Sequence, residues 1–297
     1  MSYISANGGI ATDVGGGVID IVSDGQYLWI LRQDGRILKV NAADRRLLET
    51  WTPQANIPRK LGIFGGHVWA VDNQGSLQFF NPTQPAGSTV LVAPSGITPG
   101  IYPALAFDGT NLWLGNSSSQ NLSVLSPTTF TYTSTLVAAN VDGLVFDGAN
   151  MWVLLANATI LKATASSSGG LTIVETIALA GPVNDCKMVY DGTNIWIPSG
   201  NGLLQVVHPT TASPSVLPSS VIDVAGVPDV NFPYVASFDG ENVMIGGVQN
   251  GVVAVYKATT MALVGTFNTG ANSVRGIASN GLSFNVGDAV GTKFFQF

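Results

Sequence analysis

Charged residues are scarce in this 297-residue chain, and their scarcity excludes several classes of protein. Only 10% of the residues are Asp, Glu, Lys or Arg, while 46% are hydrophobic and 35 are Gly. Intrinsic disorder requires low hydrophobicity and high net charge, which is the reverse of this composition. A long coiled coil requires charged residues beside its apolar seam, and so little charge cannot supply them.

Long hydrophobic runs, cysteines and basic surface are also missing. No stretch approaches the roughly 18 apolar residues of a membrane-spanning helix, so we expect no membrane insertion. One cysteine cannot form a disulfide framework or a cysteine-based zinc site. A net charge of −6 argues against binding to nucleic acid, because neutralising phosphates requires clustered Lys and Arg.

The N-terminal segment lacks the basic and apolar regions of a signal peptide. We therefore expect the chain to be made in the cytoplasm and not to be exported by the usual route. Its final location is a separate question, which the function classes below address.

Seven segments with a common pattern dominate the sequence. Each has an apolar run, an Asp-Gly pair or a degenerate equivalent, and a second apolar run that carries Trp in five copies. The copies are IVSDGQYLWIL (21–31), IFGGHVWAV (63–71), LAFDGTNLWLG (105–115), LVFDGANMWVL (144–154), MVYDGTNIWIP (188–198), ASFDGENVMIG (236–246) and IASNGLSFNV (277–286). Their mean spacing of about 43 residues is typical of four-stranded propeller blades.

The stretches between the copies add two further strands to each unit, such as 36–40 and 46–51. No window has a convincing apolar period of 3.6 residues. We expect an all-β chain that forms a single seven-bladed β-propeller of four-stranded antiparallel blades over residues 1–297. The blades should start near residues 17, 58, 101, 140, 184, 232 and 273.

The last copy is followed by only one more strand before residue 297. A closed ring removes open sheet edges, so the missing fourth strand must come from elsewhere in the chain. We expect residues 1–6 to supply it, joined to the first blade by a flexible glycine-rich stretch that ends at Gly17.

The repeat Phe-Asp-Gly-Thr-Asn-Leu-Trp and its sister copies resemble the blades of YVTN, NHL and virginiamycin-B-lyase-like propellers. The pattern also looks like the DGxNLW blades of phage and bacterial surface propellers. Such propellers include lyases, lactonases, binding modules and structural subunits, so the resemblance implies the fold more than the function.

The lyase resemblance implies a Mg²⁺ site with a catalytic His, and the lactonase resemblance implies a Glu, Asn and Asp cage at the channel. His67 and His208 both fall in turn positions that match neither pattern. The three glutamates, Glu49, Glu175 and Glu241, fall on outer strands or in a turn. We therefore assign no catalytic residue, no metal site and no cofactor.

The repeated residues themselves have structural explanations. Asp accepts hydrogen bonds from its own backbone and Gly takes a positive φ, so each Asp-Gly pair suits a hairpin turn better than a calcium site. The in-phase Trp residues should pack between blades, with Met244 and Phe284 in the same slot of two other copies. Cys186 should be a small buried side chain.

The polar residues that remain gather at one structural phase, the start of each inner strand beside the channel mouth. They are Asp20, Arg59, Lys60, Tyr102, Asn140, Asp142, Asn184, Asp185, Lys187, Tyr234 and Arg275. One interpretation is a ligand pocket at the mouth of the channel. The other is that wet strand ends carry charges for solubility or for mutual pairing. The opposed signs argue against a simple anion or cation trap.

Two classes of function follow. The first is a non-enzymatic structural or adhesive propeller, such as a phage virion or tail component for host attachment, that binds other structural proteins or surface glycans within a larger, oligomeric assembly. Low charge and turns rich in Ser, Thr, Asn and Gly favour it. The alternative is a metal-dependent lyase or lactonase-type hydrolase at the channel mouth, with Asn184, Asp142 and Asp185 as its candidate ligands.

Overall fold

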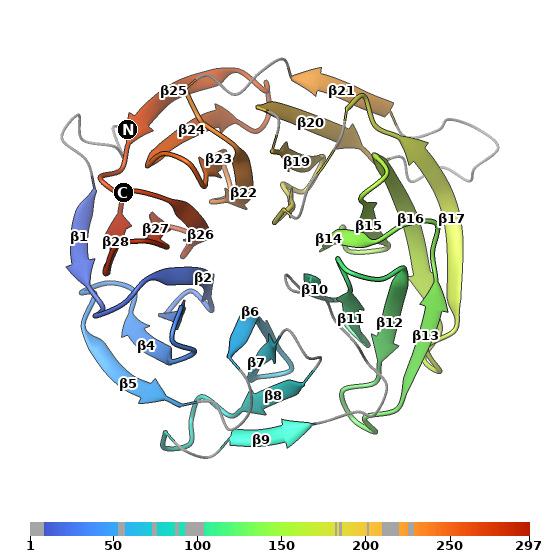
Figure 1. Cartoon of the computed structure of the whole chain (residues 1–297), viewed down its shortest axis with the longest axis horizontal. Coiled ribbons are helices and arrows are strands. Elements are labelled where there is room, and N and C mark those ends of the chain that lie inside the picture. The colour runs from blue at the N-terminus through green and yellow to red at the C-terminus, as the bar shows by residue number, and fades with distance from the viewer. Residues whose placement is uncertain are drawn as a thin grey trace.

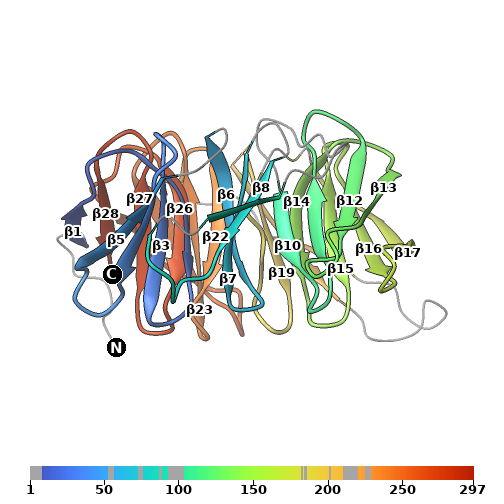
Figure 2. The same ribbon diagram turned by 90° about the horizontal axis from the view of Figure 1, so that it is seen from below.

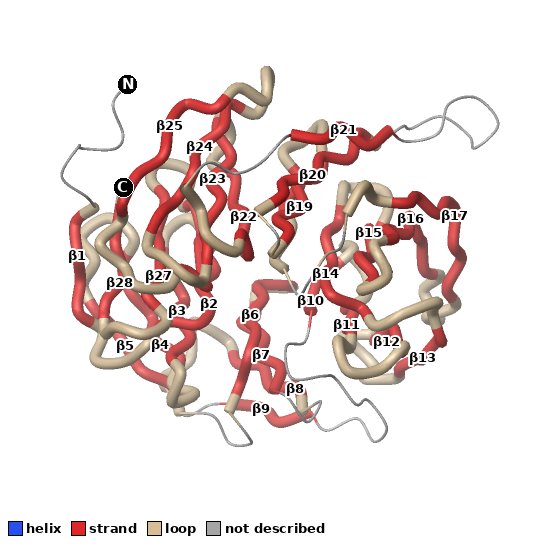
Figure 3. The backbone as a smooth tube through the Cα atoms, turned by 45° about the horizontal axis from the view of Figure 1, so that its top comes forward, coloured by secondary structure: helices blue, strands red, loops and turns tan. Residues whose placement is uncertain are grey.

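The computed structural model describes residues 9–52, 57–72, 76–86, 89–92, 104–181, 183, 186–200, 202–209, 220–224 and 229–297. Seven four-stranded antiparallel sheets stand around a central axis, which confirms the expected seven-bladed β-propeller (Figure 1). Every regular element among the described residues is a strand (Figure 3). Within these residues no helix is long and apolar enough to cross a membrane.

Each blade has its first strand at the channel and its last strand at the rim (Figure 1). Blades 1 and 2 consist of β2 (Val18–Ser23), β3 (Tyr27–Arg32), β4 (Ile37–Asn41) and β5 (Leu47–Trp51), then β6 (Pro58–Phe64), β7 (His67–Asp72), β8 (Leu77–Phe80) and β9 (Thr89–Val92). Blades 3 and 4 consist of β10 (Ala104–Phe107), β11 (Leu112–Gly115), β12 (Asn121–Leu125) and β13 (Tyr132–Leu136), then β14 (Val141–Phe146), β15 (Met151–Leu155), β16 (Thr159–Ala165) and β17 (Leu171–Ala178).

The second half of the ring repeats this order. Blades 5 and 6 consist of β18 (Val189–Tyr190), β19 (Ile195–Ser199), β20 (Leu203–His208) and β21 (Ser220–Val224), then β22 (Pro233–Phe238), β23 (Asn242–Gly247), β24 (Val252–Lys257) and β25 (Leu263–Asn268). Blade 7 consists of β26 (Val274–Ser279), β27 (Phe284–Asp288), β28 (Lys293–Gln296) and β1 (Ile10–Asp13).

Blade 7 joins the two ends of the chain, as expected, but through a later segment than the one predicted. β1 pairs antiparallel with β28, with Ile10 opposite Gln296 and Asp13 opposite Lys293. Residues 1–6 lie outside the described residues, and the stretch predicted to be a flexible link contains β1 itself. The reason is the length of the connection between blades: four residues separate β13 from β14, and four separate β1 from β2.

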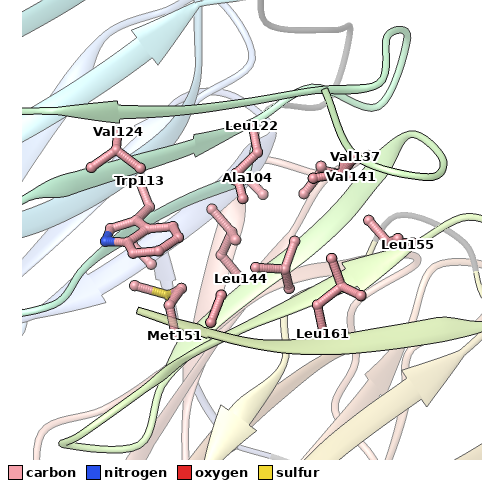
Figure 4. Packing of buried hydrophobic residues seen from close by; sticks show 13 residues of the cluster. Ala104, Trp113, Leu122, Val124, Val137, Val141, Leu144, Met151, Leu155 and Leu161 are labelled. Atoms are coloured by element: carbon pink, nitrogen blue, oxygen red, sulfur yellow. The ribbon is translucent and has the colours of Figure 1, made fainter. Parts of the chain in front are cut away.

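The hydrophobic core lies between neighbouring sheets. Figure 4 shows the layer between blades 3 and 4, where Trp113 and Leu122 from one sheet face Leu144 and Met151 from the next. Full burial of one such side chain stabilises the fold by about 1.5–3 kcal/mol. Because similar clusters recur around the ring, contact between blades is the main source of stability.

Glycines on the second strand of three blades allow the next blade to come close. A Cβ atom on Gly115 would overlap the side chain of Val141, and one on Gly287 would overlap that of Val18. Gly246 stands in the same relation to the first residue of β26. The valine at the start of an inner strand thus packs on bare backbone of the preceding blade.

The tryptophan slot is buried as expected, with one correction. Trp113, Trp152, Trp196 and Met244 are all fully buried there. In blade 7, however, Asn285 occupies this slot. It pairs with Ala278 of the inner strand, as Trp113 pairs with Ala106 in blade 3, and Phe284 lies one residue earlier. Asn285 is buried and donates to the carbonyl oxygen of Ala278, while it accepts a bond from Gln296.

Candidate functional site

The strands run between two faces of the ring (Figure 2). We name the face where the inner strands begin the mouth face. We name the opposite face, which carries the hairpin turns at residues 24–25, 108–109, 147–148 and 191–192, the turn face. The polar residues predicted from the sequence belong to the mouth face.

Among the described residues, a β-bulge recurs at the start of five inner strands, and its extra residue is Ile19 in β2 and polar in the other four. In β6, Pro58 pairs with Asp72 and Lys60 with Val71, which leaves Arg59 as an extra residue. Asp142, Tyr234 and Arg275 are the extra residues at the same phase of their strands. A bulge bends its strand and redirects a side chain, so these four residues leave the regular inward and outward alternation.

Asp20 and Lys187 form an ion pair that crosses the channel. Lys187 Nζ lies 2.9 Å from Asp20 Oδ1 and donates a second bond of 2.9 Å to the carbonyl oxygen of Ile21. The backbone N–H of Leu61 donates to Asp20 Oδ2 at 2.9 Å. Asp20 has 0% exposure, and the side chain of Lys187 is 28% exposed. One carboxylate therefore joins blades 1, 2 and 5.

Two further cationic side chains lie over the ring of Tyr234 in blade 6. Lys60 Nζ lies 5.4 Å and Arg275 Cζ lies 5.5 Å from the centroid of its ring. The ring is largely buried, which strengthens the attraction between a cation and the face of an aromatic ring. We call Asp20, Lys60, Lys187, Tyr234 and Arg275 the channel cluster.

The backbone around the channel cluster ties blade 5 to blade 6. The N–H of Lys187 donates to the carbonyl oxygen of Tyr234 at 2.9 Å, and the N–H of Ala236 donates to that of Lys187 at 2.9 Å. Lys187 and Val235 form a parallel bridge between the two blades. The backbone of Lys187 is thus held in place by blade 6.

Of the other predicted residues, three are described by the structure and three lie outside the described residues. Asn140 lies between blades and donates to the carbonyl oxygen of Ser117 at 3.1 Å. Asp142 is buried, and its carbonyl oxygen accepts from the N–H of Cys186 at 3.2 Å. Arg59 is half-buried at the bulge of β6. Tyr102, Asn184 and Asp185 lie outside the described residues.

Both histidines lie on the turn face, away from the channel cluster. His67 starts β7 and pairs with Phe64, four residues along β6 from Lys60, a separation of about 13 Å at 3.3 Å per residue. His208 ends β20 and contacts Asn194 Oδ1 through Nδ1 at 2.9 Å. In the part of the chain that the structure describes, no group of three or more His, Cys, Asp or Glu could hold a metal ion.

The turn face is organised by a contact that the sequence analysis missed. The Asp of the hairpin turn accepts two backbone bonds through one oxygen, as expected, and its other oxygen accepts the indole N–H of the Trp five residues later. The Trp Nε1 to Asp Oδ2 distances are 3.1 Å for Trp29 and Asp24, 2.7 Å for Trp113 and Asp108, 2.7 Å for Trp152 and Asp147, and 2.6 Å for Trp196 and Asp191. In the sequence, this bond is indicated by the constant spacing of five residues between the turn Asp and the Trp.

Blade 2 departs from this pattern and forms a different surface. Its turn is one residue shorter and has Gly65 and Gly66 in place of the Asp-Gly pair, so Trp69 Nε1 donates to the carbonyl oxygen of Phe64 at 3.2 Å. A cavity of about 280 Å³ lies beside this turn, lined by Phe64, Gly65, His67, Trp69, Phe107, Pro127 and Thr128. We call it the blade 2–3 pocket.

The next pair of blades has a smaller cavity at the equivalent place. It measures about 210 Å³ and is lined by Asp108, Thr110, Trp113, Phe146, Ala149, Met151, Thr164, Ala165 and Ser167. Both oxygens of Asp108 are occupied by its own turn and by Trp113. The first cavity thus has mostly aromatic walls and no turn carboxylate, whereas the second contains Asp108 and several Thr and Ser side chains.

Two residues with shifted pKa values, Tyr190 and Glu241, also lie on the turn face. Burial and the carboxylates of Asp147 and Asp191 raise the pKa of Tyr190, whose hydroxyl donates to the carbonyl oxygen of Gly192 at 2.7 Å. A hydrogen bond and ion pair with Lys257 lower the pKa of Glu241. Neither group belongs to the channel cluster.

Comparison with known proteins supports the β-propeller fold and gives no family or function. The seven four-stranded sheets define a seven-bladed β-propeller. No family model matches the chain, and no curated protein matches it. It is similar to the β-propeller domain of Cps50 (Swd1) from Myceliophteria thermophila, with a TM-score of 0.75 over 95% of this chain and 97% of that chain. The identity of 9% shows a shared fold alone.

Proposed function

We propose that this chain is a non-enzymatic binding propeller, a component of a larger particle such as a phage virion or tail that presents its faces to structural proteins or surface glycans. The channel cluster is the observation that carries the non-enzymatic part. Both oxygens of the buried Asp20 carboxylate accept hydrogen bonds, from Lys187 and from two backbone N–H groups. A carboxylate held in this way serves to join three blades.

The position of the histidines supports the same proposal. A general acid or base must come within hydrogen-bond reach of the reacting group, either directly or through one water molecule. His67 and His208 are separated from the channel cluster by the length of a strand. A lyase site at the mouth face would have to work without either of them.

The particle part of the proposal rests on composition and on the resemblance of the repeat. The chain has few charges, its turns are rich in Ser, Thr, Asn and Gly, and its DGxNLW blades look like those of phage and bacterial surface propellers. A propeller with a rigid ring and two broad faces is suited to binding partner proteins, because little order has to be gained on association.

Metal binding tests the proposal against the alternative enzyme. The full chain and its Asp142→Ala and Asp185→Ala variants are titrated with Mg²⁺ and Ca²⁺ by calorimetry. We expect no saturable one-to-one binding in any of them. Stoichiometric binding that disappears in both variants would overturn the proposal in favour of a metal-dependent lyase or hydrolase.

The particle assignment needs its own measurement. Particles purified by density gradient from the source culture are labelled with gold-conjugated antibody against the chain and viewed by electron microscopy. Label at one regular position on the particle supports the assignment. Recovery of the whole chain in fractions free of particles refutes it.

A further inference from the structure

The blade 2–3 pocket lies beside the one turn of the repeat in which two glycines replace the Asp-Gly pair. In four other blades, a turn carboxylate occupies the space beside the Trp indole and satisfies its N–H. Blade 2 has Gly65 there, and no atom lies within 4 Å of where its Cβ would be. Blade 2 therefore lacks the turn carboxylate that Asp108 supplies in the smaller cavity of the next pair of blades.

Aromatic rings form the walls of the pocket. The rings of Phe64 and Phe107, from neighbouring blades, have centroids 5.1 Å apart. The imidazole of His67 meets the ring of Phe79 edge to face at 5.2 Å, and Phe79 packs on Trp69 at 4.6 Å. These contacts hold the walls in place before any ligand arrives, which reduces the entropy lost on binding.

The size and polarity of the pocket restrict its ligand. Its volume of about 280 Å³ falls just below the range of about 300–1,000 Å³ for sites that take whole small molecules, so a single ring is the better fit. A sugar would have to leave several hydroxyl groups without partners, since only His67 and Thr128 offer polar side chains. A protein side chain with an apolar ring fits both the volume of the pocket and its small number of polar groups.

His67, which lines the pocket, can offer a hydrogen-bond acceptor to a ligand. Its Nδ1 lies 2.9 Å from the carbonyl oxygen of Gly65. A carbonyl oxygen only accepts, so Nδ1 carries the proton, and in the neutral ring Nε2 is left as an acceptor. A tyrosine side chain combines an aromatic ring with one O–H donor.

We infer that the blade 2–3 pocket binds a tyrosine side chain presented by a partner protein. This inference rests on the proposed function, because it names one contact by which the propeller would hold a partner. Tyrosine is among the residues that most often anchor protein interfaces in such pockets.

The test uses N-acetyl-L-tyrosinamide as the probe, followed by the imidazole resonances of His67 in the NMR spectrum of the full chain. We expect saturable shifts with a dissociation constant of about 1 mM or below. N-acetyl-L-phenylalaninamide should bind about five-fold more weakly because it lacks the donor. Methyl β-D-glucopyranoside should cause no shift.

A matched pair of variants controls for folding and for binding elsewhere. Thr128→Trp fills the rim of the pocket and should weaken binding of the tyrosine probe at least ten-fold. Thr83→Trp places the same side chain at the equivalent exposed turn position of blade 2 and should leave binding unchanged. His67→Phe keeps an aromatic ring and removes the acceptor, so it should abolish the preference for tyrosine over phenylalanine. Near-ultraviolet circular dichroism checks that each variant is folded.

Several results would overturn the inference. They are the absence of saturable shifts, stronger binding of the glucoside than of the tyrosine probe, equal binding of the two amino-acid probes to the natural chain, and unchanged binding in folded Thr128→Trp. Failure here is distinguishable from failure of the proposed function, because the metal titration concerns the mouth face and does not depend on the pocket.

Discussion

The bond between the turn carboxylate and the tryptophan indole should be visible as a difference between two equivalent substitutions. Asp147 Oδ1 accepts the N–H groups of Ala149 and Asn150 at 2.8 and 2.6 Å, and its Oδ2 accepts the indole N–H of Trp152 at 2.7 Å. Trp152 is fully buried. Asp147→Ala therefore removes two turn bonds and leaves a buried indole N–H without its acceptor.

Asp239 provides an internal control. It makes the same two backbone bonds, to Glu241 at 2.8 Å and Asn242 at 2.7 Å, and the same long contact with the Asn side chain of its turn. The Trp slot of its blade holds Met244, which has no N–H to satisfy. Asp239→Ala thus removes the turn bonds alone.

The difference between the two variants measures the indole bond. Loss of turn or cap bonds costs about 1–2 kcal/mol, which we expect for Asp239→Ala. A buried donor left unpaired adds about 1–3 kcal/mol, so Asp147→Ala should cost about 2 kcal/mol more. In a Trp152→Met background, this excess should disappear.

Equilibrium unfolding in urea, followed by fluorescence and by circular dichroism, supplies the free energies, with the slopes compared to verify that the unfolded states match. Equal costs for Asp147→Ala and Asp239→Ala, within about 0.5 kcal/mol, would refute the reasoning, since surface changes without a named mechanism fall in that range. An excess that persists in the Trp152→Met background would also contradict it.

Three further predictions concern the centre, the core and the closure of the ring. Lys187→Met should destabilise the fold by about 3 kcal/mol in urea unfolding, because it leaves Asp20 buried without its cation, and adding Asp20→Asn should recover part of that loss. Burial raises the pKa of Tyr256, and its hydroxyl has no partner among the described residues. The shift therefore stabilises the folded state fully below the ordinary pKa of 10.0, and this stabilisation is lost as pH rises through the raised pKa. Tyr256→Phe should therefore be neutral or stabilising by up to about 1 kcal/mol at pH 7 and should remove that alkaline loss in unfolding measured against pH. Asp13→Cys with Lys293→Cys should form a disulfide on oxidation, seen by mass spectrometry, and its absence would contradict the pairing of β1 with β28.

The architecture was predictable because the same short sequence pattern recurs in the blades. Alternating apolar residues, an Asp-Gly turn and a second apolar strand specify a hairpin within one short segment, and about seven such units at one spacing specify a closed ring. Even the bond from Trp to Asp is local, at a spacing of five residues, and could have been proposed from the pattern DGxNxW.

The closing strand shows where local reasoning reached its limit. The missing strand of blade 7 was correctly sought near the N-terminus, yet β1 occupies Ile10–Asp13 within the stretch expected to be a flexible link. Glycine content suggested flexibility, whereas the short connection between other blades, such as β13 to β14, would have placed the strand correctly. The slot of Asn285 was also misjudged, by one residue, in the most degenerate copy of the repeat.

The sequence by itself determined that this protein is a seven-bladed ring and that its polar residues collect at the start of the inner strands. Only the tertiary structure decided which of them meet. Asp20 and Lys187 are 167 positions apart, and Lys60 reaches Tyr234 from another blade. Such contacts depend on how blades are arranged around the channel and on the bulges that recur in the inner strands. Long-range geometry of this kind leaves no periodic trace in a single chain, because each blade contributes only one member of each pair.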